Sequence, residues 1–156
     1  KNYKMVASEV MERNLGETEN IIINQLRKSC LQEAMGCEAK SEFKLYKGTE
    51  MKESDIFASA VEESEFCVRL CCSKCHPYTM VVKEESSGDE IVTMDRPFAC
   101  AAAGCKCCCY QNMTVSSGGQ KLGTITEDCY YCVPSFTVTN STDVAIHKIK
   151  PPTCLG

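Results

Sequence analysis

The stretch from Tyr110 to Ile149, YQNMTVSSGGQKLGTITEDCYYCVPSFTVTNSTDVAIHKI, decides the fold class of this chain. Its apolar and β-branched residues form short runs typical of β-strands. Glycine, asparagine and serine separate these runs, as in Ser117-Gly-Gly-Gln120 and Thr139-Asn-Ser-Thr142, and are typical of turns. The runs predict four strands: Tyr110 to Val115, Lys121 to Thr126, Ser135 to Thr139 and Asp143 to Ile149.

The same pattern extends upstream to Ser41. Glu42-Phe-Lys-Leu-Tyr-Lys47 alternates apolar and polar residues, which is typical of a strand with one buried face. Three further strands are predicted at Ile56 to Val61, Tyr78 to Lys83 and Glu90 to Met94. About eight short strands separated by turns indicate a mainly β fold, an antiparallel meander in a barrel or a sandwich.

The first forty residues have helical periodicity instead. Met5, Val10 and Leu15 recur at helical spacing, and Gly16 can end that helix. A second helix is predicted from Asn20 to Met35. We therefore divide the chain into a helical segment, residues 1–40, and a β domain, residues 41–156.

The composition and the distribution of apolar and charged residues indicate which kind of protein this is. The chain has 156 residues, 14 cysteines and a net charge of −4. No run approaches the ~18 apolar residues of a transmembrane helix, and the first residues lack the apolar stretch of a signal peptide. These features favour a cytosol-facing, reducing environment. Since neither half of the chain is basic, nucleic acid is not an expected partner.

The cysteines fall into three groups, Cys67 to Cys75, Cys100 to Cys109, and Cys129 to Cys132, with Cys154 beyond them. One interpretation is structural zinc, because two Cys-x-x-Cys pairs can supply four thiolates. The candidate ligands are Cys72, Cys75, Cys129 and Cys132. The gaps between these pairs are longer than the ~15–20 residues usual in zinc ribbons.

Disulfides and thioester acylation are the other two interpretations. A secreted disulfide domain would fit the glycosylation sequons at Asn112 and Asn140 and would have few free thiols. Without a signal peptide, we interpret both asparagines as turn residues. Several palmitoyl chains on one loop could instead hold a cytosolic domain at a membrane, where stable anchoring takes at least two signals.

No enzyme constellation is present, so we do not expect an enzyme. There is no Walker loop, no Gly-x-Gly-x-x-Gly and no Cys-His-Asp order. His147 is expected at the surface of its strand. The adjacent carboxylates Glu62-Glu63 and Glu84-Glu85 lie beside turns, and we expect water to solvate them.

Four segments, taken in order, resemble the phospholipid scramblase family, and with Gly36-Cys-Glu38 they extend the resemblance over residues 30 to 154. They are Cys67-Val-Arg-Leu-Cys-Cys72 with Pro77-Tyr-Thr-Met80, Asp95-Arg-Pro-Phe-Ala-Cys100, the run Cys105 to Cys109, and Cys132-Val-Pro-Ser-Phe-Thr-Val138 with the residues to Cys154. The resemblance implies a tubby-like antiparallel β-barrel around a C-terminal hydrophobic helix. It also implies calcium-activated, ATP-independent movement of phospholipids between leaflets.

The resemblance further implies palmitoylation, which falls here on Cys105, Cys107, Cys108 and Cys109. The implied location is the cytosolic side of the plasma membrane or of another intracellular membrane, with protein partners possible. In the family, the calcium-binding segment and the C-terminal helix follow the part of the domain that ends here. We therefore expect an incomplete barrel, no calcium site within these residues, and no scrambling by them alone. A zinc-stabilised protein-binding module is the alternative function.

Overall fold

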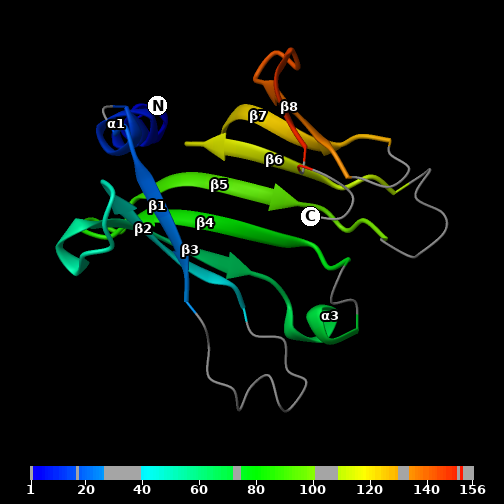
Figure 1. Ribbon diagram of the computed structural model, residues 1–156, viewed down its shortest axis with the longest axis horizontal. Helices are drawn as coiled ribbons and strands as arrows, with labels where there is room; N and C mark the ends of the chain where they lie inside the picture. Colours follow the sequence, from blue (N-terminus) through cyan, green and yellow to red (C-terminus); the bar gives the residue numbers. More distant parts are fainter. Residues whose placement is uncertain are drawn as a thin grey trace.

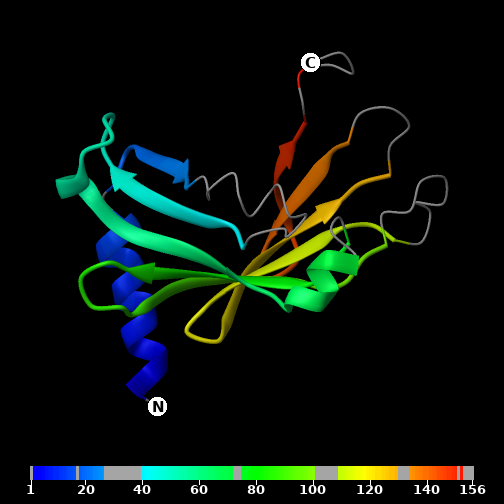
Figure 2. The same cartoon turned by 90° about the horizontal axis from the view of Figure 1, so that it is seen from below.

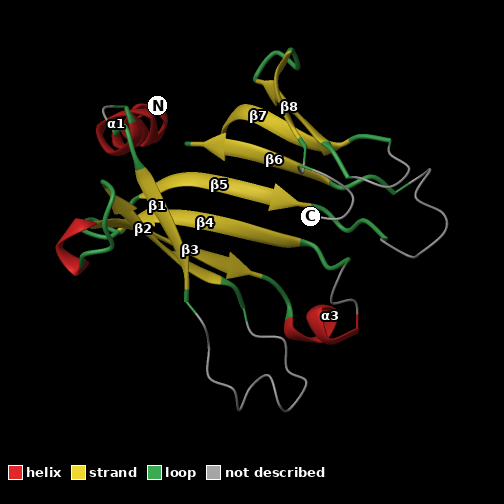
Figure 3. Cartoon of the chain, viewed as in Figure 1, coloured by secondary structure: helices red, strands yellow, loops and turns green. Residues whose placement is uncertain are grey.

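The computed structural model describes residues 2–16, 18–26, 40–71, 75–100, 109–129, 134–150 and 152. Within them, a nine-stranded antiparallel sheet dominates (Figures 1 and 3), which confirms the mainly β prediction. The strands are β1 (Ile21–Gln25), β2 (Glu42–Lys47), β3 (Ile56–Glu63), β4 (Tyr78–Glu84), β5 (Glu90–Arg96), β6 (Asn112–Ser117), β7 (Gln120–Glu127), β8 (Phe136–Asn140) and β9 (Ala145–Ile149). The helices are α1 (Asn2–Leu15), α3 (Phe66–Cys71) and the 3-10 turn η1 (Glu53–Asp55).

Each strand pairs with the strands that precede and follow it in sequence, so the order in the sheet is β1 through β9. The strands β2 to β9 correspond to the eight predicted ones. The predicted turn between β6 and β7 is confirmed: Gly118 and Gly119 have φ values of 55° and 72°. A two-residue hairpin turn with both φ values positive favours glycine, because it has no Cβ to clash.

The predicted helix from Asn20 is wrong where the structure describes it. Ile21 to Gln25 form the edge strand β1, in which Ile21 pairs with Lys47 and Gln25 with Phe43 of β2. Three consecutive β-branched isoleucines favour extended backbone, and an available strand edge supplies their hydrogen bonds. The rest of the predicted helix, residues 27–35, lies outside the described residues. The first helix is confirmed, and it ends where the Gly16 amide donates to the Glu12 carbonyl.

The described sheet is strongly twisted and open (Figure 2), with β1 and β9 as its unpaired edges. This arrangement is consistent with the predicted incomplete barrel. Along β9 every residue is exposed, including His147, as expected for a terminal strand.

The hydrophobic core lies between α1 and one face of the sheet. Val10 is 3% exposed and belongs to a buried cluster with Ala58 and Ala60 of β3, Val82 of β4 and Ile91 of β5. Further partly buried side chains, among them those of Met11, Leu15, Met80 and Met94, pack against this cluster. Of the strands, α1 lies closest to β5 and β6.

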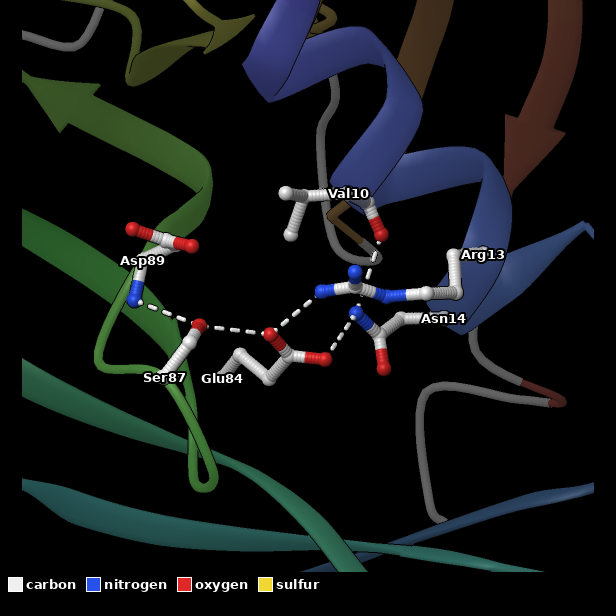
Figure 4. A network of polar contacts seen from close by, with 6 residues as sticks. All are labelled: Val10, Arg13, Asn14, Glu84, Ser87 and Asp89. Atoms are coloured by element: carbon white, nitrogen blue, oxygen red, sulfur yellow. Dashed lines mark hydrogen bonds and ion pairs between the residues drawn. The ribbon is translucent and has the colours of Figure 1, made fainter.

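A buried carboxylate, that of Glu84 at the end of β4, fixes α1 on this core (Figure 4). Ser87 Oγ donates to Glu84 Oε2 over 2.6 Å, and Asn14 Nδ2 donates to Oε1 over 3.0 Å. Arg13 Nη2 lies 2.6 Å from Oε2, but its side chain is 61% exposed. The hydrogen bonds from Ser87 and Asn14, followed by the charge of Arg13, lower the pKa of Glu84 despite its burial.

We expect Asn14→Ala to lower the free energy of unfolding by about 1–3 kcal/mol, because one oxygen of a buried carboxylate would lose its donor. Arg13→Ala is the matched control on the next residue and should cost less than about 1 kcal/mol, since water solvates that guanidinium. Urea titration of both variants measures the difference. Equal losses in the two variants would contradict this account of how α1 is attached.

Candidate functional site

Every connection that follows an odd-numbered strand joins its two strands at the same end of the sheet. In an antiparallel meander, successive connections alternate between the two ends. Thus β3 ends and β4 begins at one end, where α3 also lies (Figure 1), and the pairs Glu63–Thr79 and Asp95–Thr114 mark it. We call this the cysteine end, and define it by the strand-terminal residues Gln25, Glu42, Glu63, Tyr78, Arg96, Asn112, Glu127 and Phe136.

The name reflects where the cysteines fall in the sequence. Thirteen belong to the connections between β1 and β2, β3 and β4, β5 and β6, and β7 and β8, and Cys154 follows β9. None of the six described cysteines, Cys67, Cys71, Cys75, Cys100, Cys109 and Cys129, lies in a strand, in α1 or in a connection at the opposite end. The structure describes the side chains of five: Cys67 and Cys129 are exposed, and Cys75, Cys100 and Cys109 are half-buried.

Glu62, the buried penultimate residue of β3, accepts hydrogen bonds that fix the start of the connection from β3 to β4. Ser64 Oγ donates to Glu62 Oε1 over 2.6 Å, and the Ser41 amide donates to Oε2 over 3.0 Å. The imidazole of His76 is also buried, with its Nε2 3.1 Å from Glu62 Oε1. Burial raises the pKa of Glu62, but these hydrogen bonds, that from Ser64 foremost, outweigh it and lower the pKa to about 2.

Arg69 extends this network into α3. Its Nη1 donates to the carbonyl oxygen of Ser64 over 2.7 Å and to Ser64 Oγ over 2.8 Å. The guanidinium is buried although arginine is usually exposed, because oxygens accept its protons. An ionised Glu62 with its oxygens occupied acts as an anchor for α3 and for the segment that carries Cys67 and Cys75.

Gln111 ties three connections together. Its Oε1 accepts from Arg96 Nη2 over 2.6 Å, and its Nε2 donates to the Ala99 carbonyl over 3.1 Å. The Gln111 amide donates to Glu127 Oε2 over 2.9 Å. In turn, the Ala99 amide donates to the Cys75 carbonyl over 3.4 Å. Segments that carry Cys75, Cys100, Cys109 and Cys129 are therefore fixed relative to one another.

Asp128 holds the last connection, directly before Cys129. Thr137 Oγ1 and Ser135 Oγ donate to its two carboxylate oxygens over 2.7 Å and 2.9 Å. These hydrogen bonds, with a smaller contribution from Lys148, lower the pKa of Asp128. These hydrogen bonds join the residue that follows β7 to the start of β8.

A groove of about 670 Å³ lies between α3 and the ends of β4, β5 and β6. Among the described residues that line it, the charged ones are mostly acidic, with Glu63, Glu65 and Asp95 against the one cation Arg96. Arg96 lies over the ring of Tyr78, 5.2 Å from its centre. The sequence did not predict this groove, because its residues come from separate strands and only the register places them side by side.

The predicted acylation and zinc sites are only partly described. Of the acylation sites, Cys109 lies just before β6, while Cys105, Cys107 and Cys108 lie outside the described residues. Of the zinc ligands, Cys75 and Cys129 are described and Cys72 and Cys132 are not. Among the described side chains, no three of His, Cys, Asp or Glu gather where they could hold a metal ion.

The two sequon asparagines differ. Asn140, the last residue of β8, begins the turn to β9 as predicted, since its Oδ1 accepts from the amides of Thr142 and Val144, each over 3.0 Å. The turn interpretation of Asn112 is wrong, because Asn112 begins strand β6 and pairs with Thr126. The expectation that Glu62 and Glu84 are solvated is also wrong, since both are buried beneath hydrogen-bond donors.

We expect the stability contributed by Glu62 to depend on pH. Its pKa is about 2 in the folded chain against an ordinary 4.5, so the contribution is complete above pH 4.5 and is lost as pH falls towards 2. Glu62→Gln should cost about 1–3 kcal/mol at neutral pH and remove this acid-dependent decline. Urea titrations at stepped pH measure both effects.

Glu63→Gln is the matched control, because Glu63 is exposed on the opposite face of the same strand. Its pH profile should follow that of the parent chain. Parallel profiles for the parent chain and Glu62→Gln would show that Glu62 does not anchor this end.

Three comparisons relate this chain to known proteins. Human phospholipid scramblase 2 is 30% identical over 93 residues, which cover 60% of this chain and 31% of that protein. Human phospholipid scramblase 1 is 29% identical over 93 residues, with 60% and 29% covered. Mouse phospholipid scramblase 1 is 31% identical over 94 residues, with 60% and 28% covered. The matched region thus spans about a third of each relative's length or slightly less.

No solved structure matches the chain. The family model described as "Scramblase" matches residues 2–155, which is nearly all of the sequence and includes every strand of the sheet. The chain therefore belongs to the scramblase family.

Proposed function

We propose that this chain is a membrane-associated scramblase-family protein that handles phospholipid and is not an enzyme. Acyl thioesters on Cys105, Cys107, Cys108 and Cys109 hold it at the cytosolic face of the plasma membrane or another intracellular membrane. The observation that carries the proposal is one of sequence position: thirteen of the 14 cysteines fall between strands whose joined ends lie at the cysteine end, and Cys154 follows β9. Acylation at one end would orient the whole sheet relative to the bilayer.

Several acyl chains suit this geometry better than one. A single chain gives only marginal, reversible membrane binding, and a second signal is needed for stable anchoring. Four of the cysteines occur within Cys105 to Cys109, so two or more acyl groups can share one connection. The ends of that connection are held by Arg96, Ala99 and Gln111, so an anchor there is coupled directly to the sheet.

Mass spectrometry of the intact protein from its native cells tests the anchor. We expect mass steps of one palmitoyl group that disappear after treatment with hydroxylamine, which cleaves thioesters. Cys→Ser substitution at residues 105, 107, 108 and 109 together should move the chain from the membrane fraction to the soluble fraction. Cys129→Ser is the control, because Cys129 is an exposed thiol in a different connection.

A mass that hydroxylamine leaves unchanged would contradict the acylation proposal. The alternative, a zinc-stabilised binding module, would then be tested by native mass spectrometry. Stoichiometric zinc that is lost on substitution of Cys72, Cys75, Cys129 and Cys132 would favour it. The joining of the Cys75 segment to the Glu127 end of β7 through Ala99 and Gln111 is compatible with ligands from these two connections.

The relatives are named for phospholipid scrambling, and we propose calcium-activated, ATP-independent scrambling as the activity to which this chain contributes. Among the described residues no helix has the length and apolar character needed to cross a membrane.

The 156 residues by themselves are expected not to scramble. The reason is that the match spans 28–31% of these relatives and the nine described strands form an open sheet. The assay uses liposomes with a fluorescent phospholipid in both leaflets and an impermeant quencher outside. Calcium should not increase the quenched fraction above that of protein-free liposomes. A calcium-dependent increase would show that these residues suffice.

A further inference from the structure

Two of the five phenylalanines are exposed, and both lie at the cysteine end. Phe66 begins α3 and is 51% exposed, and Phe98 follows β5 and is 56% exposed. The other three, Phe43, Phe57 and Phe136, are buried or half-buried in the sheet. An exposed phenylalanine is unfavourable in water, so two beside the cysteine-bearing segments need an explanation.

Phe66 is held outward by its own helix. Arg69, one turn along α3, donates from its amide to the Glu65 carbonyl and from its guanidinium to Ser64. The same guanidinium lies 5.9 Å from the centre of the Phe66 ring. Ser64 in turn donates to the buried Glu62 of β3, so Arg69 and Ser64 connect the start of α3, where Phe66 lies, to the sheet.

Phe98 is held outward by the backbone on both sides. Arg96, two residues before it, is bonded to Gln111. Ala99, directly after it, is buried and bonded through its amide to Cys75 and through its carbonyl to Gln111. Because the backbone on both sides is fixed, the Phe98 ring stays exposed.

The two rings follow strands that end close together. The strands that lead to them, β3 and β5, are separated only by β4, so their ends lie roughly 10 Å apart. Among the described residues, the exposed charges near the two rings are mainly the carboxylates Glu63, Glu65 and Asp95. These carboxylates would repel anionic lipids, so the attraction that the two rings offer a bilayer is apolar contact rather than charge.

We propose that Phe66 and Phe98 insert into the interfacial layer of a phospholipid bilayer as a second attachment, separate from the acyl chains. This rests on the proposed membrane association and adds the protein surface that makes the contact. Apolar and aromatic side chains in this layer strengthen binding in proportion to the apolar area they bury. Together with the acyl anchor, the two rings fix which end of the sheet faces the lipid.

The absence of tryptophan from the sequence allows a direct test. Phe66→Trp and Phe98→Trp each introduce a single reporter, and Met51→Trp is the control. Met51 is 61% exposed but lies in the β2–β3 connection at the opposite end. The acylated full chain is bound to phosphatidylcholine vesicles whose lipids carry bromine near the headgroup, which quenches tryptophan on contact.

Quenching and a blue shift at positions 66 and 98, with neither at position 51, is the expected result. A vesicle-bound chain with unquenched tryptophan at 66 and 98 would overturn the inference and leave the acyl anchor standing. If the acylated chain is not obtained, binding of the unacylated chain to vesicles at saturating lipid tests the same inference. There, Phe66→Ala and Phe98→Ala should each lower the vesicle partition coefficient about tenfold, and Met51→Ala should not change it. No binding of the unacylated parent chain would also overturn the inference.

Discussion

Pairing of each strand with its neighbours in sequence is the constraint on which the rest of the structure depends. Once nine strands pair in order, every connection is assigned to one of two ends by whether it follows an odd or an even strand. The connections at one end carry cysteines and the exposed rings of Phe66 and Phe98. Those at the other are mostly short turns built on Gly48, Gly88, Gly118 and Gly119. The order of the strands alone therefore puts the cysteine-bearing connections at one end of the sheet and the glycine turns at the other.

Two buried carboxylates then attach the helices to this sheet. Glu62 and Glu84 lie on the same face as the core alanines of β3, since Glu62 is two residues beyond Ala60 and Glu84 pairs with Ala58. Glu84 holds α1 near one end of the sheet, and Glu62 holds α3 at the cysteine end. Each is ionised in a place that excludes water, so each needs several donors at once. Protonation at low pH would weaken both attachments together.

Much of the fold could be predicted from the sequence, because its strands are short, alternate in polarity and are punctuated by turn residues. The edge strand β1 could not, since Ile21 to Ile23 fit a helix stripe as well as a strand, and only the edge of β2 decides between them. The rest of that predicted helix includes Cys30 and lies outside the described residues. The helix α3 lacked a signal because six residues are too few to show periodicity.

The site was less predictable than the fold. Glu84 is bonded to Asn14, 70 positions away, and Gln111 joins segments on either side of it, so local sequence gave no reason to distinguish them from solvated polar residues. The cysteines were recognisable as three groups, but only the complete strand order shows that the strands flanking these groups are joined at the same end of the sheet.

Hydrogen–deuterium exchange of the acylated chain, free and bound to phosphatidylcholine vesicles, tests the orientation of the sheet most directly. The account predicts slower exchange on binding in the connections at the cysteine end, residues 64–77, 97–111 and 128–135. Exchange should be unchanged in the turns at the opposite end, residues 48–55, 85–89, 118–119 and 141–144. Protection of the opposite turns, or equal protection at both ends, would contradict the claim that the cysteine end faces the membrane.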